Sequence, residues 1–315
     1  MTDSLHTSVM AEQALRLLQP HPDGLYIDAT LGGGGHTKAL LDASAPHGRV
    51  LSLDLDPAAL KRARERFASY GARWIGVEAN FRNLEEVANA HGFAPCDGVL
   101  FDLGISSDQL EDTRKGLSFQ EDGPLDMRLG PRANEDGLTA SEIVNSWSRD
   151  EIEKLLRVFG EERFARRIAD RIAEARDAGR ITRTLDLSAV VRTAVPERFR
   201  RGRINPATKT FMALRIAVND ELESLKRAIA GARSIIKERG RIAVISFHSL
   251  EDRIVKHAFR DAPDLDAVTK RPLVPEQNEI LKNPRARSAK LRVAEKRPQT
   301  TTYVSDHRTE YDTPS

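Results

Sequence analysis

The sequence predicts an α/β fold in which a doubly wound, mostly parallel, Rossmann-like sheet is interrupted by an all-helical insertion. Three observations lead to this prediction. Short β-rich runs alternate with helical stretches over the first hundred residues, a helical region without strand signals follows, and a further apolar strand appears near residue 240. We therefore expect residues 1–105 and 211–315 to form one sheet-containing domain, with residues 106–210 inserted as a helical domain for substrate recognition.

The first half of the predicted sheet comes from apolar runs that are rich in β-branched and aromatic residues. These runs predict strands at 25–30, 49–56, 73–81 and 97–104, and the stretches between them predict helices at 37–45, 57–68 and 83–90. Because a helix follows each strand, the strands should run parallel and carry helices on both faces.

The insertion begins where this alternation stops. After residue 104, a polar stretch with many Gly and Pro residues predicts loops. Helices are predicted beyond it, at 186–194 and where apolar residues recur at helical spacing, namely Ile152, Leu155, Leu156, Phe159, Ile168 and Ile172. The α/β pattern returns with a long helix at 207–238, a strand at 240–247 and a helix over HSLEDRIVKHAF.

Composition limits the classes of protein to consider. The 315 residues are 40% hydrophobic and 30% charged, and no apolar run approaches the roughly 18 residues of a membrane span. The single cysteine, Cys96, excludes an intramolecular disulfide framework and a multi-cysteine zinc site. The opening MTDSLHTSVMAEQAL has no export signal. We expect a soluble, cytoplasmic protein without a membrane partner.

Basic residues gather in two segments although the net charge is only +2. Residues 282–297 and residues 192–203 are each rich in Lys and Arg with a single acidic residue. Such segments can follow a phosphate backbone. The alternative for each is a solvated face.

The sharpest local motif is DATLGGGGH at 28–36, between the first predicted strand and a helix. A dinucleotide fingerprint fails because Thr37 or Lys38 occupies the place of its third glycine, and a P-loop fails because Ala39 follows Lys38. The loop resembles the first motif of class I methyltransferases, D-x-G-x-G-x-G, with Thr30 in place of the first glycine.

Three further residues stand at strand ends, where open α/β sheets bind ligands. Asp54 ends the second strand, where a carboxylate can accept both ribose hydroxyls of a nucleoside. Phe81 follows the third strand and Asp102 ends the fourth. Taken alone, Phe81 could be a core residue and Asp102 a helix cap, but their joint placement favours a nucleoside pocket.

Longer motifs make the resemblance specific. The chain resembles the bacterial small-subunit ribosomal RNA cytidine N4-methyltransferase family. The matching stretches are HTSVM at 6–10, DATLGGGGH at 28–36, DLGISSDQL at 102–110, GLSFQEDGPLDMR at 116–128, NPATKTFMALRIAVNDEL at 205–222, ISFHSLEDRIVK at 245–256 and NPRARSAKLRVAEK at 283–296.

The resemblance implies methyl transfer from S-adenosylmethionine to the exocyclic N4 of a decoding-region cytidine, with ribosomal RNA, within the assembled small subunit, as the partner. It also implies cofactor contacts from Gly34, Gly35, His36, Asp54, Phe81, Asp102 and Gln109. Amino-methyltransferases usually carry D/S-P-P-Y/F after the fourth strand, with an aromatic that stacks on the flipped base. This chain has Asp102-Leu103-Gly104-Ile105 there, which leaves Phe119 and Phe247 as candidates.

The chemistry follows from which atom is methylated. Methylation of a cytosine carbon needs a cysteine nucleophile, but Cys96 precedes the fourth strand and should lie at the edge opposite the glycine loop. Methylation of nitrogen needs alignment and a proton acceptor. Asp102 or a nearby backbone carbonyl could be this acceptor, and Asp102 is preferred. His248 is the second candidate, as a proton relay, although a histidine after a buried strand often has a structural role. We expect no metal.

Asp126 and Arg128 have two interpretations: they could organise the substrate mouth or form a structural ion pair. The basic residues Lys209 and Arg215 should lie near the return of the insertion, which would close over RNA. Two rival functions remain, a nucleotide-dependent oxidoreductase and a non-catalytic RNA-binding assembly factor on a methyltransferase fold. The failed dinucleotide pattern argues against the first, and the intact loop with Asp54 argues against the second. The sequence leaves the oligomeric state open.

Overall fold

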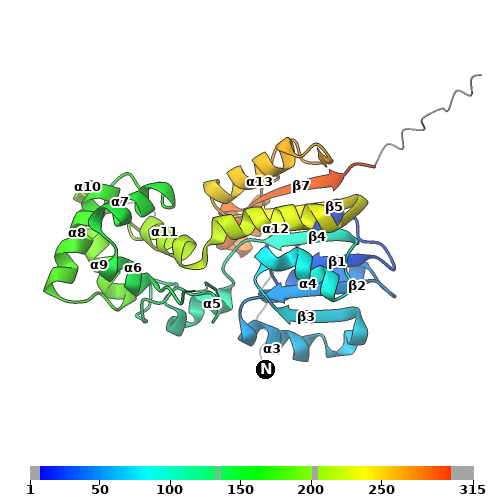
Figure 1. Ribbon diagram of the computed structural model, residues 1–315, viewed down its shortest axis with the longest axis horizontal. Helices are drawn as coiled ribbons and strands as arrows, with labels where there is room; N and C mark the ends of the chain where they lie inside the picture. Colours follow the sequence, from blue (N-terminus) through cyan, green and yellow to red (C-terminus); the bar gives the residue numbers. More distant parts are fainter. Residues whose placement is uncertain (1–7, 132, 135, 201–204, 299–315) are drawn as a thin grey trace, which may run out of the picture.

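A computed structural model of the chain describes residues 8–131, 133–134, 136–200 and 205–298. Figure 1 shows a sheet covered by helices and, beside it, a separate group of helices. In the described residues one sheet has the strand order β3-β2-β1-β4-β5-β7-β6. The strands are β1 (Leu25–Asp28), β2 (Arg49–Asp54), β3 (Trp74–Glu78), β4 (Cys96–Asp102), β5 (Ile236–Ser246), β6 (Leu265–Ala267) and β7 (Lys290–Lys296).

Strands β1 to β5 are parallel, and β7 runs antiparallel between β5 and β6. The reversal of strand order between β1 and β4 opens a crevice at the carboxyl ends of these strands, where ligands bind in doubly wound sheets. In Figure 1 the parallel strands point toward the helical group. The predicted fold class, a doubly wound and mostly parallel sheet of the class I methyltransferase type, is confirmed.

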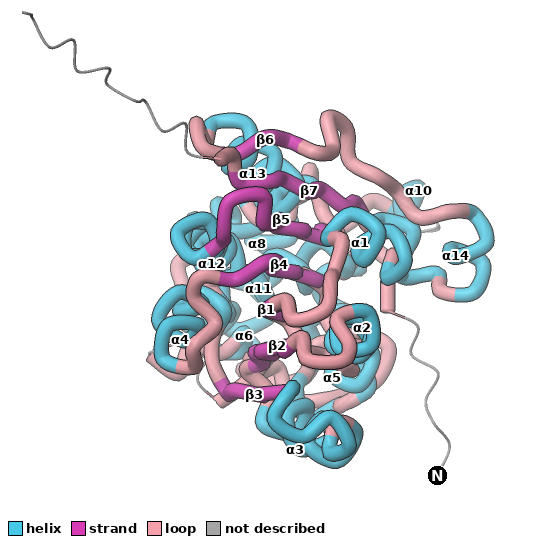
Figure 2. Tube along the Cα trace, turned by 90° about the vertical axis from the view of Figure 1, so that its right-hand side faces the viewer, coloured by secondary structure: helices cyan, strands magenta, loops and turns pink. Residues whose placement is uncertain are grey.

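Helices cover both faces of the sheet, as Figure 2 shows end-on. Leu51 and Phe101 belong to the core under α4, α12 and α13, whereas their neighbours Val50 and Leu100 belong to the core under α1, α2 and α3. Both faces are apolar because side chains alternate along a strand that is buried on both sides. These helices are α1 (Ala11–Leu18), α2 (Gly35–Ala43), α3 (Pro57–Arg66), α4 (Leu84–Ala90), α12 (Glu221–Ile235) and α13 (Ser249–Asp261).

The helical group has its own core, to which the predicted residues Ile152, Leu155, Leu156, Ile168 and Ile172 contribute. Two of its helices begin at capping boxes, formed by Thr139 with Glu142 and by Ser148 with Glu151. The helices are α5 (Ser107–Glu111), α6 (Ala140–Ser146), α7 (Arg149–Val158), α8 (Ala165–Ala178), α9 (Thr184–Ala194), α10 (Glu197–Arg200) and α11 (Thr208–Asn219).

The single helix predicted at 207–238 is wrong, because the chain breaks it at Asp220. This residue has a φ of 48°, in the left-handed region that Asp tolerates. The buried Asn219 before it uses its side-chain amide to bond the backbone of Met127 and Leu129, so the turn is held by a distant part of the chain. Apolar residues up to Val218 pack in the helical core. We therefore place the return to the sheet at Asp220 and call residues 106–219 the helical domain.

The end of the chain also differs from expectation. The basic segment 282–297 is predicted to follow phosphates, but its second half is strand β7, whose Leu291 and Val293 are fully buried. Before it lie α14 (Gln277–Lys282) and a short 3-10 helix, η4 (Pro284–Ser288); further 3-10 turns are η1 (Ala68–Arg73), η2 (Phe81–Asn83) and η3 (Thr113–Lys115). None of the helices described is long and apolar enough to cross a membrane.

Candidate active site

The loop after β1 is built around the buried Asp28. Its carboxylate accepts hydrogen bonds from the Thr30 backbone N–H at 3.1 Å and from the Thr37 hydroxyl at 2.7 Å. Gly32 and Gly34 have φ values of 50° and 76°, which glycine adopts without strain. The loop therefore curls tightly into the start of α2, where backbone N–H groups and the helix dipole favour a negatively charged ligand group.

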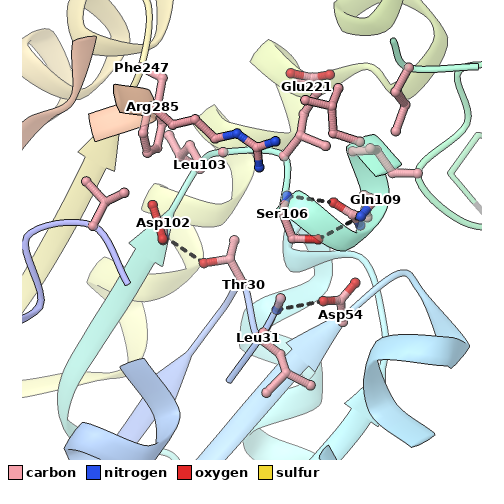
Figure 3. A pocket seen from close by; sticks show the side chains of 18 of the residues that line it. Thr30, Leu31, Asp54, Asp102, Leu103, Ser106, Gln109, Glu221, Phe247 and Arg285 are labelled. Atoms are coloured by element: carbon pink, nitrogen blue, oxygen red, sulfur yellow. Dashed lines mark hydrogen bonds between the residues drawn. The ribbon is translucent and has the colours of Figure 1, made fainter. Parts of the chain in front are cut away.

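Asp54 lies at the end of β2 and supports the same loop. Its Oδ2 accepts the Gly32 N–H at 2.8 Å (Figure 3). Its Oδ1 accepts the Asp56 N–H, also at 2.8 Å. The side chain is only 9% exposed, and burial raises the pKa of Asp54 to about 6. Each carboxylate oxygen can accept more than one hydrogen bond, so lone pairs remain for a ligand.

His36 and Asp102 form a buried pair from α2 and the end of β4. The His36 Nε2 lies 3.4 Å from Oδ2 of Asp102, a distance that makes an ion pair without hydrogen-bond geometry. Burial alone would lower the pKa of His36, but the carboxylates of Asp102 and Asp28 outweigh it and raise that pKa. The other oxygen of Asp102, Oδ1, is buried and has no hydrogen-bond partner among the residues described.

Thr30, the departure from the glycine motif, has a structural explanation. Its hydroxyl accepts the Asp102 backbone N–H at 2.6 Å (Figure 3). The threonine thus ties the loop after β1 to the end of β4, which a glycine could not do. Asp102 is held at the backbone, while its Oδ1 is buried without a hydrogen-bond partner among the described residues.

Gln109 and Phe81 complete the predicted contacts. The Gln109 side-chain oxygen accepts the Ser106 N–H at 3.1 Å, and the Ser106 hydroxyl accepts the Gln109 N–H at the same distance, a capping box that begins α5. The Phe81 ring stands edge-on to Phe101, with centroids 6.2 Å apart. Phe81 therefore packs against the core, as one of the two interpretations has it, and lines the cavity as well.

A cavity of about 470 Å³ joins these groups at the carboxyl ends of the strands. This volume is in the range of small-molecule sites. It extends from the sheet to the helical domain, whose Phe211 and Met212 form part of its wall. All the residues that the family resemblance implies as cofactor contacts line it: Gly34, Gly35, His36, Asp54, Phe81, Asp102 and Gln109.

His248 also lines the cavity and has a structural task. Its ring caps α13, with Nδ1 facing the Glu251 N–H at 3.5 Å and Nε2 lying 3.1 Å from Oε1 of Glu251. The other oxygen of Glu251 accepts the backbone N–H groups of Phe247 and His248. The ring therefore caps the helix through Nδ1, while Nε2 makes no hydrogen bond within the described residues. The cap supports the structural interpretation, and the unpartnered Nε2 leaves a role in proton transfer open.

Glu221 joins His248 and Glu251 in a cluster whose ligand atoms all lie within 4.8 Å of one another. By geometry alone such a cluster can hold a metal ion. However, the Arg215 guanidinium donates to both oxygens of Glu221, at 2.7 and 2.9 Å. The negative charge is thus already balanced by the chain, and the cluster is better described as an ion-pair network. Sequence reasoning overlooked both glutamates because acidic residues in a first helical turn are ordinary.

One expectation about the helical return needs correction. Arg215 does not face outward for RNA, since the ion pair with Glu221 holds it half-buried. Lys209 is exposed, as its predicted role requires, and donates to the backbone oxygen of Glu161 at 2.8 Å. For Asp126 and Arg128 the structural alternative describes the molecule: they form an ion pair at 2.7 Å and do not line the cavity.

Cys96 lies where the sequence places it. It is fully buried at the amino end of β4, at the far edge of the sheet from the glycine loop. Burial raises the pKa of its thiol to about 12. A thiol that stays protonated and does not line the cavity cannot act as the nucleophile of a cysteine mechanism.

The basic residues of strand β7 are used inside the protein. Lys290 and Arg292 pair with Asp252 at 2.9 and 2.6 Å, and Lys296 pairs with Asp264 at 2.7 Å. Of residues 192–203, Arg200 donates to backbone oxygens within its own segment, and residues 201–203 lie outside the part of the chain described. The expectation that 282–297 follows a phosphate backbone is therefore wrong for β7. On η4, Arg285 and Arg287 have exposed side chains.

The chain is similar to known proteins over most of its length. The chain is 44% identical to ribosomal RNA small subunit methyltransferase H of Trichlorobacter lovleyi, over 94% of this chain and 99% of the relative. It is 47% identical to the protein of that name from Thermomicrobium roseum, over 92% and 93%. A solved putative rRNA-methylase of Clostridium thermocellum covers 92% of this chain and 98% of its own at 12% identity, with a TM-score of 0.46. A model of the MraW methylase family matches residues 3–297, and the chain therefore belongs to that family.

Proposed function

We propose that this protein transfers a methyl group from S-adenosylmethionine to the exocyclic N4 of a cytidine in the decoding region of small-subunit ribosomal RNA. The observation that carries the proposal is the cavity itself, which joins the glycine loop, Asp54 and Asp102, with its buried and unpartnered Oδ1, at one sheet edge. Relatives at 44–47% identity are named ribosomal RNA small subunit methyltransferases. The same chemistry would place the protein in the cytoplasm, with its substrate.

The residues present fit this cofactor. Asp54 would accept the ribose hydroxyls, and the loop with Gly34, Gly35 and His36 would hold the charged amino-acid part. Phe81 and Gln109 line the remaining wall. When bound, the cofactor supplies an electrophilic methyl group on a sulfonium. The buried Oδ1 of Asp102 also fits, because an unpartnered buried carboxylate oxygen is costly unless a ligand uses it.

Asp102 is the group we assign to the proton of the target amino group. Its open oxygen can accept an N–H from the cytidine amino group, which localises the lone pair on nitrogen as the methyl group is transferred. The same oxygen could instead contact the amino group of the cofactor, so the two roles must be separated by rate and affinity. His248, fixed by Glu251, is the second candidate for carrying the proton away.

The helical domain would form the other wall of the substrate site. A cytidine within structured RNA must leave its stack to reach a buried methyl donor, and the cavity reaches Phe211 and Met212 of this domain. The substrate would be the assembled small subunit, in which the decoding-region RNA already has its shape. The alternative, a non-catalytic assembly factor, would need the same RNA contacts without the open Asp102 oxygen.

The test is methyl transfer to defined substrates. The protein would be incubated with labelled S-adenosylmethionine and either assembled small subunits or their deproteinised RNA, and the modified nucleotide would be mapped by mass spectrometry. We expect label on the N4 of one cytidine, with more from subunits than from free RNA. Label on a ring carbon would refute nitrogen chemistry, and tight RNA binding without any transfer would favour the assembly factor.

A further inference from the structure

Phe247 and Arg285 meet at the mouth of the cavity although they are far apart in the sequence. Phe247 directly follows β5, and η4 with Arg285 directly precedes β7. The antiparallel pairing of these strands aligns Ser246 with Lys290, which brings both segments to the edge where Asp102 ends β4. Figure 3 displays both side chains above Leu103, with the guanidinium group of Arg285 projecting over the cavity.

Phe247 has the position of a stacking platform. Its half-buried ring lies against the loop after β4, so closely that a Cβ on Gly104 would come within 3.0 Å of it. This is the loop that carries the aromatic in other amino-methyltransferases. Phe119, the other candidate, also lines the cavity, but it packs edge-on against Phe211 at 5.2 Å and belongs to the helical side of the wall. The geometry favours Phe247, delivered from the end of the neighbouring strand.

Arg285 is presented from a fixed backbone. Its backbone N–H donates to the side-chain oxygen of Asn283 at 3.2 Å, and the neighbouring Ala286 is fully buried. The side chain is exposed at the cavity rim. A guanidinium group offers parallel N–H donors in one plane. The base edge of cytosine carries two adjacent acceptors, O2 and N3, whereas uracil carries an N3–H donor.

We propose that Phe247 and Arg285 form the subsite for the target base, in which the cytosine ring stacks on Phe247 and its O2 and N3 accept hydrogen bonds from Arg285. This inference rests on the proposed function and adds how the base is chosen. In this arrangement the exocyclic amino group, next to N3, is left for Asp102. Arg285 thus reads a base edge, unlike a lysine or arginine that only neutralises phosphate.

The matched control is Arg287, which is exposed on the same short helix but does not line the cavity. Single-turnover rates would be measured at subsaturating small subunits, after the methylated position has been mapped. Arg285→Ala should lower this rate about 5- to 150-fold, the discrimination of a good bidentate base contact, and Arg287→Ala should change it less than about twofold. The salt dependence of RNA binding should stay that of the wild type in Arg285→Ala, because no phosphate contact is lost.

An atomic substitution in the RNA makes the test specific. Subunits would be reconstituted with 3-deazacytidine at the methylated position, which replaces the N3 acceptor by CH. On this substrate the wild type can no longer form the hydrogen bond from Arg285 to N3. The ratio of the wild-type rate to the Arg285→Ala rate should therefore fall toward one. The ratio cancels any change in the reactivity of the base itself. Arg285→Gln, which keeps the first part of the aliphatic chain without the charged fork, serves if the alanine variant fails to fold.

Phe247 is tested in the same assay. Phe247→Leu should lower the rate about 5- to 150-fold, as expected for lost base stacking, and Phe247→Tyr, which keeps an aromatic face, should restore most of it. The inference is overturned by an unchanged rate in Arg285→Ala, by a rate ratio that is the same with 3-deazacytidine, or by a flattened salt dependence that marks a phosphate contact. Absence of methyl transfer by the wild type to unmodified subunits would instead refute the proposed function.

Discussion

Replacing Asp54 by asparagine should weaken S-adenosylmethionine binding about 10- to 150-fold while the fold persists. Hydrogen bonds to a charged acceptor are worth about 1.5–3 kcal/mol, which gives this range of dissociation constants. Asparagine is preferable to alanine because Asp54 also accepts the N–H groups of Gly32 and Asp56. An amide keeps the shape and one of these acceptors, whereas alanine would loosen the glycine loop as well.

The pH dependence follows from burial. Burial raises the pKa of Asp54 from 3.8 to about 6, so keeping the carboxylate ionised costs the folded protein about 3 kcal/mol at 1.36 kcal/mol per pKa unit. Because the folded-state pKa is raised, protonation of Asp54 favours the folded state; this stabilisation, relative to the ionised form, is fully present below pH 3.8 and is lost as the pH rises through about 6. Asparagine has no charge, so the variant does not have the free-energy cost of a buried carboxylate at neutral pH. This gain in stability offsets the loss of one hydrogen-bond acceptor. We therefore expect similar melting temperatures.

Calorimetric titration at a series of pH values from 5 to 8 measures both effects. The wild type should bind the cofactor more weakly as the pH falls below about 6, where Asp54 becomes protonated, and Asp54→Asn should lack this step. Glu78→Gln is the control, because Glu78 aligns with Asp54 on the neighbouring strand but is exposed and outside the cavity. A folded Asp54→Asn protein with an unchanged dissociation constant, or with the same pH step, would refute the reasoning.

Cys96→Ser should keep methyl transfer within about twofold but lower thermal stability, since a buried hydroxyl without a partner costs about 1–3 kcal/mol; a folded, substrate-binding but inactive variant would contradict nitrogen chemistry. Asp102→Ala should lower the single-turnover rate at saturating cofactor about 10²- to 10⁴-fold if it accepts the proton, and a loss seen only in cofactor affinity would leave it a binding residue. Gly34→Ala should destabilise the protein in thermal unfolding, because its φ of 76° is strained for alanine and its new Cβ would lie 2.8 Å from Phe67; an unchanged melting temperature would contradict the left-handed conformation and the close packing of this loop.

Much of the cofactor side of the site could be predicted from the sequence. The glycine loop, Asp54 and Asp102 each follow a predicted strand, and parallel strands deliver their carboxyl ends to one edge. The pattern of strands and helices in the sequence was therefore enough to predict that these residues lie close together, without knowledge of any side-chain contact. The place of Cys96 was predictable for the same reason, because it stands at the other end of a strand.

The substrate side depended on contacts between distant segments. Whether Arg215 faces RNA or Glu221 depends on the break at Asp220, which Asn219 holds through bonds to residues some ninety positions away. The helical periodicity of the sequence continues across Asp220 and does not show this break. The prediction of one long helix was wrong for that reason. The charge pattern alone predicts that Lys290 contacts an RNA phosphate, because the sequence does not reveal that Asp252 lies beside this lysine.

The sequence by itself determined the fold class, the family resemblance and the edge of the sheet at which ligands bind, since these follow from the order of strands and helices. Only the tertiary structure decided which charges remain for a substrate. Ion pairing and strand register are set by three-dimensional neighbours, as in the pairing of β5 with β7 that brings Phe247 and Arg285 together. A cluster of basic residues in the sequence can bind a ligand only where folding leaves the side chains facing a cavity. Where folding packs a carboxylate beside them, the carboxylate takes the place of the ligand.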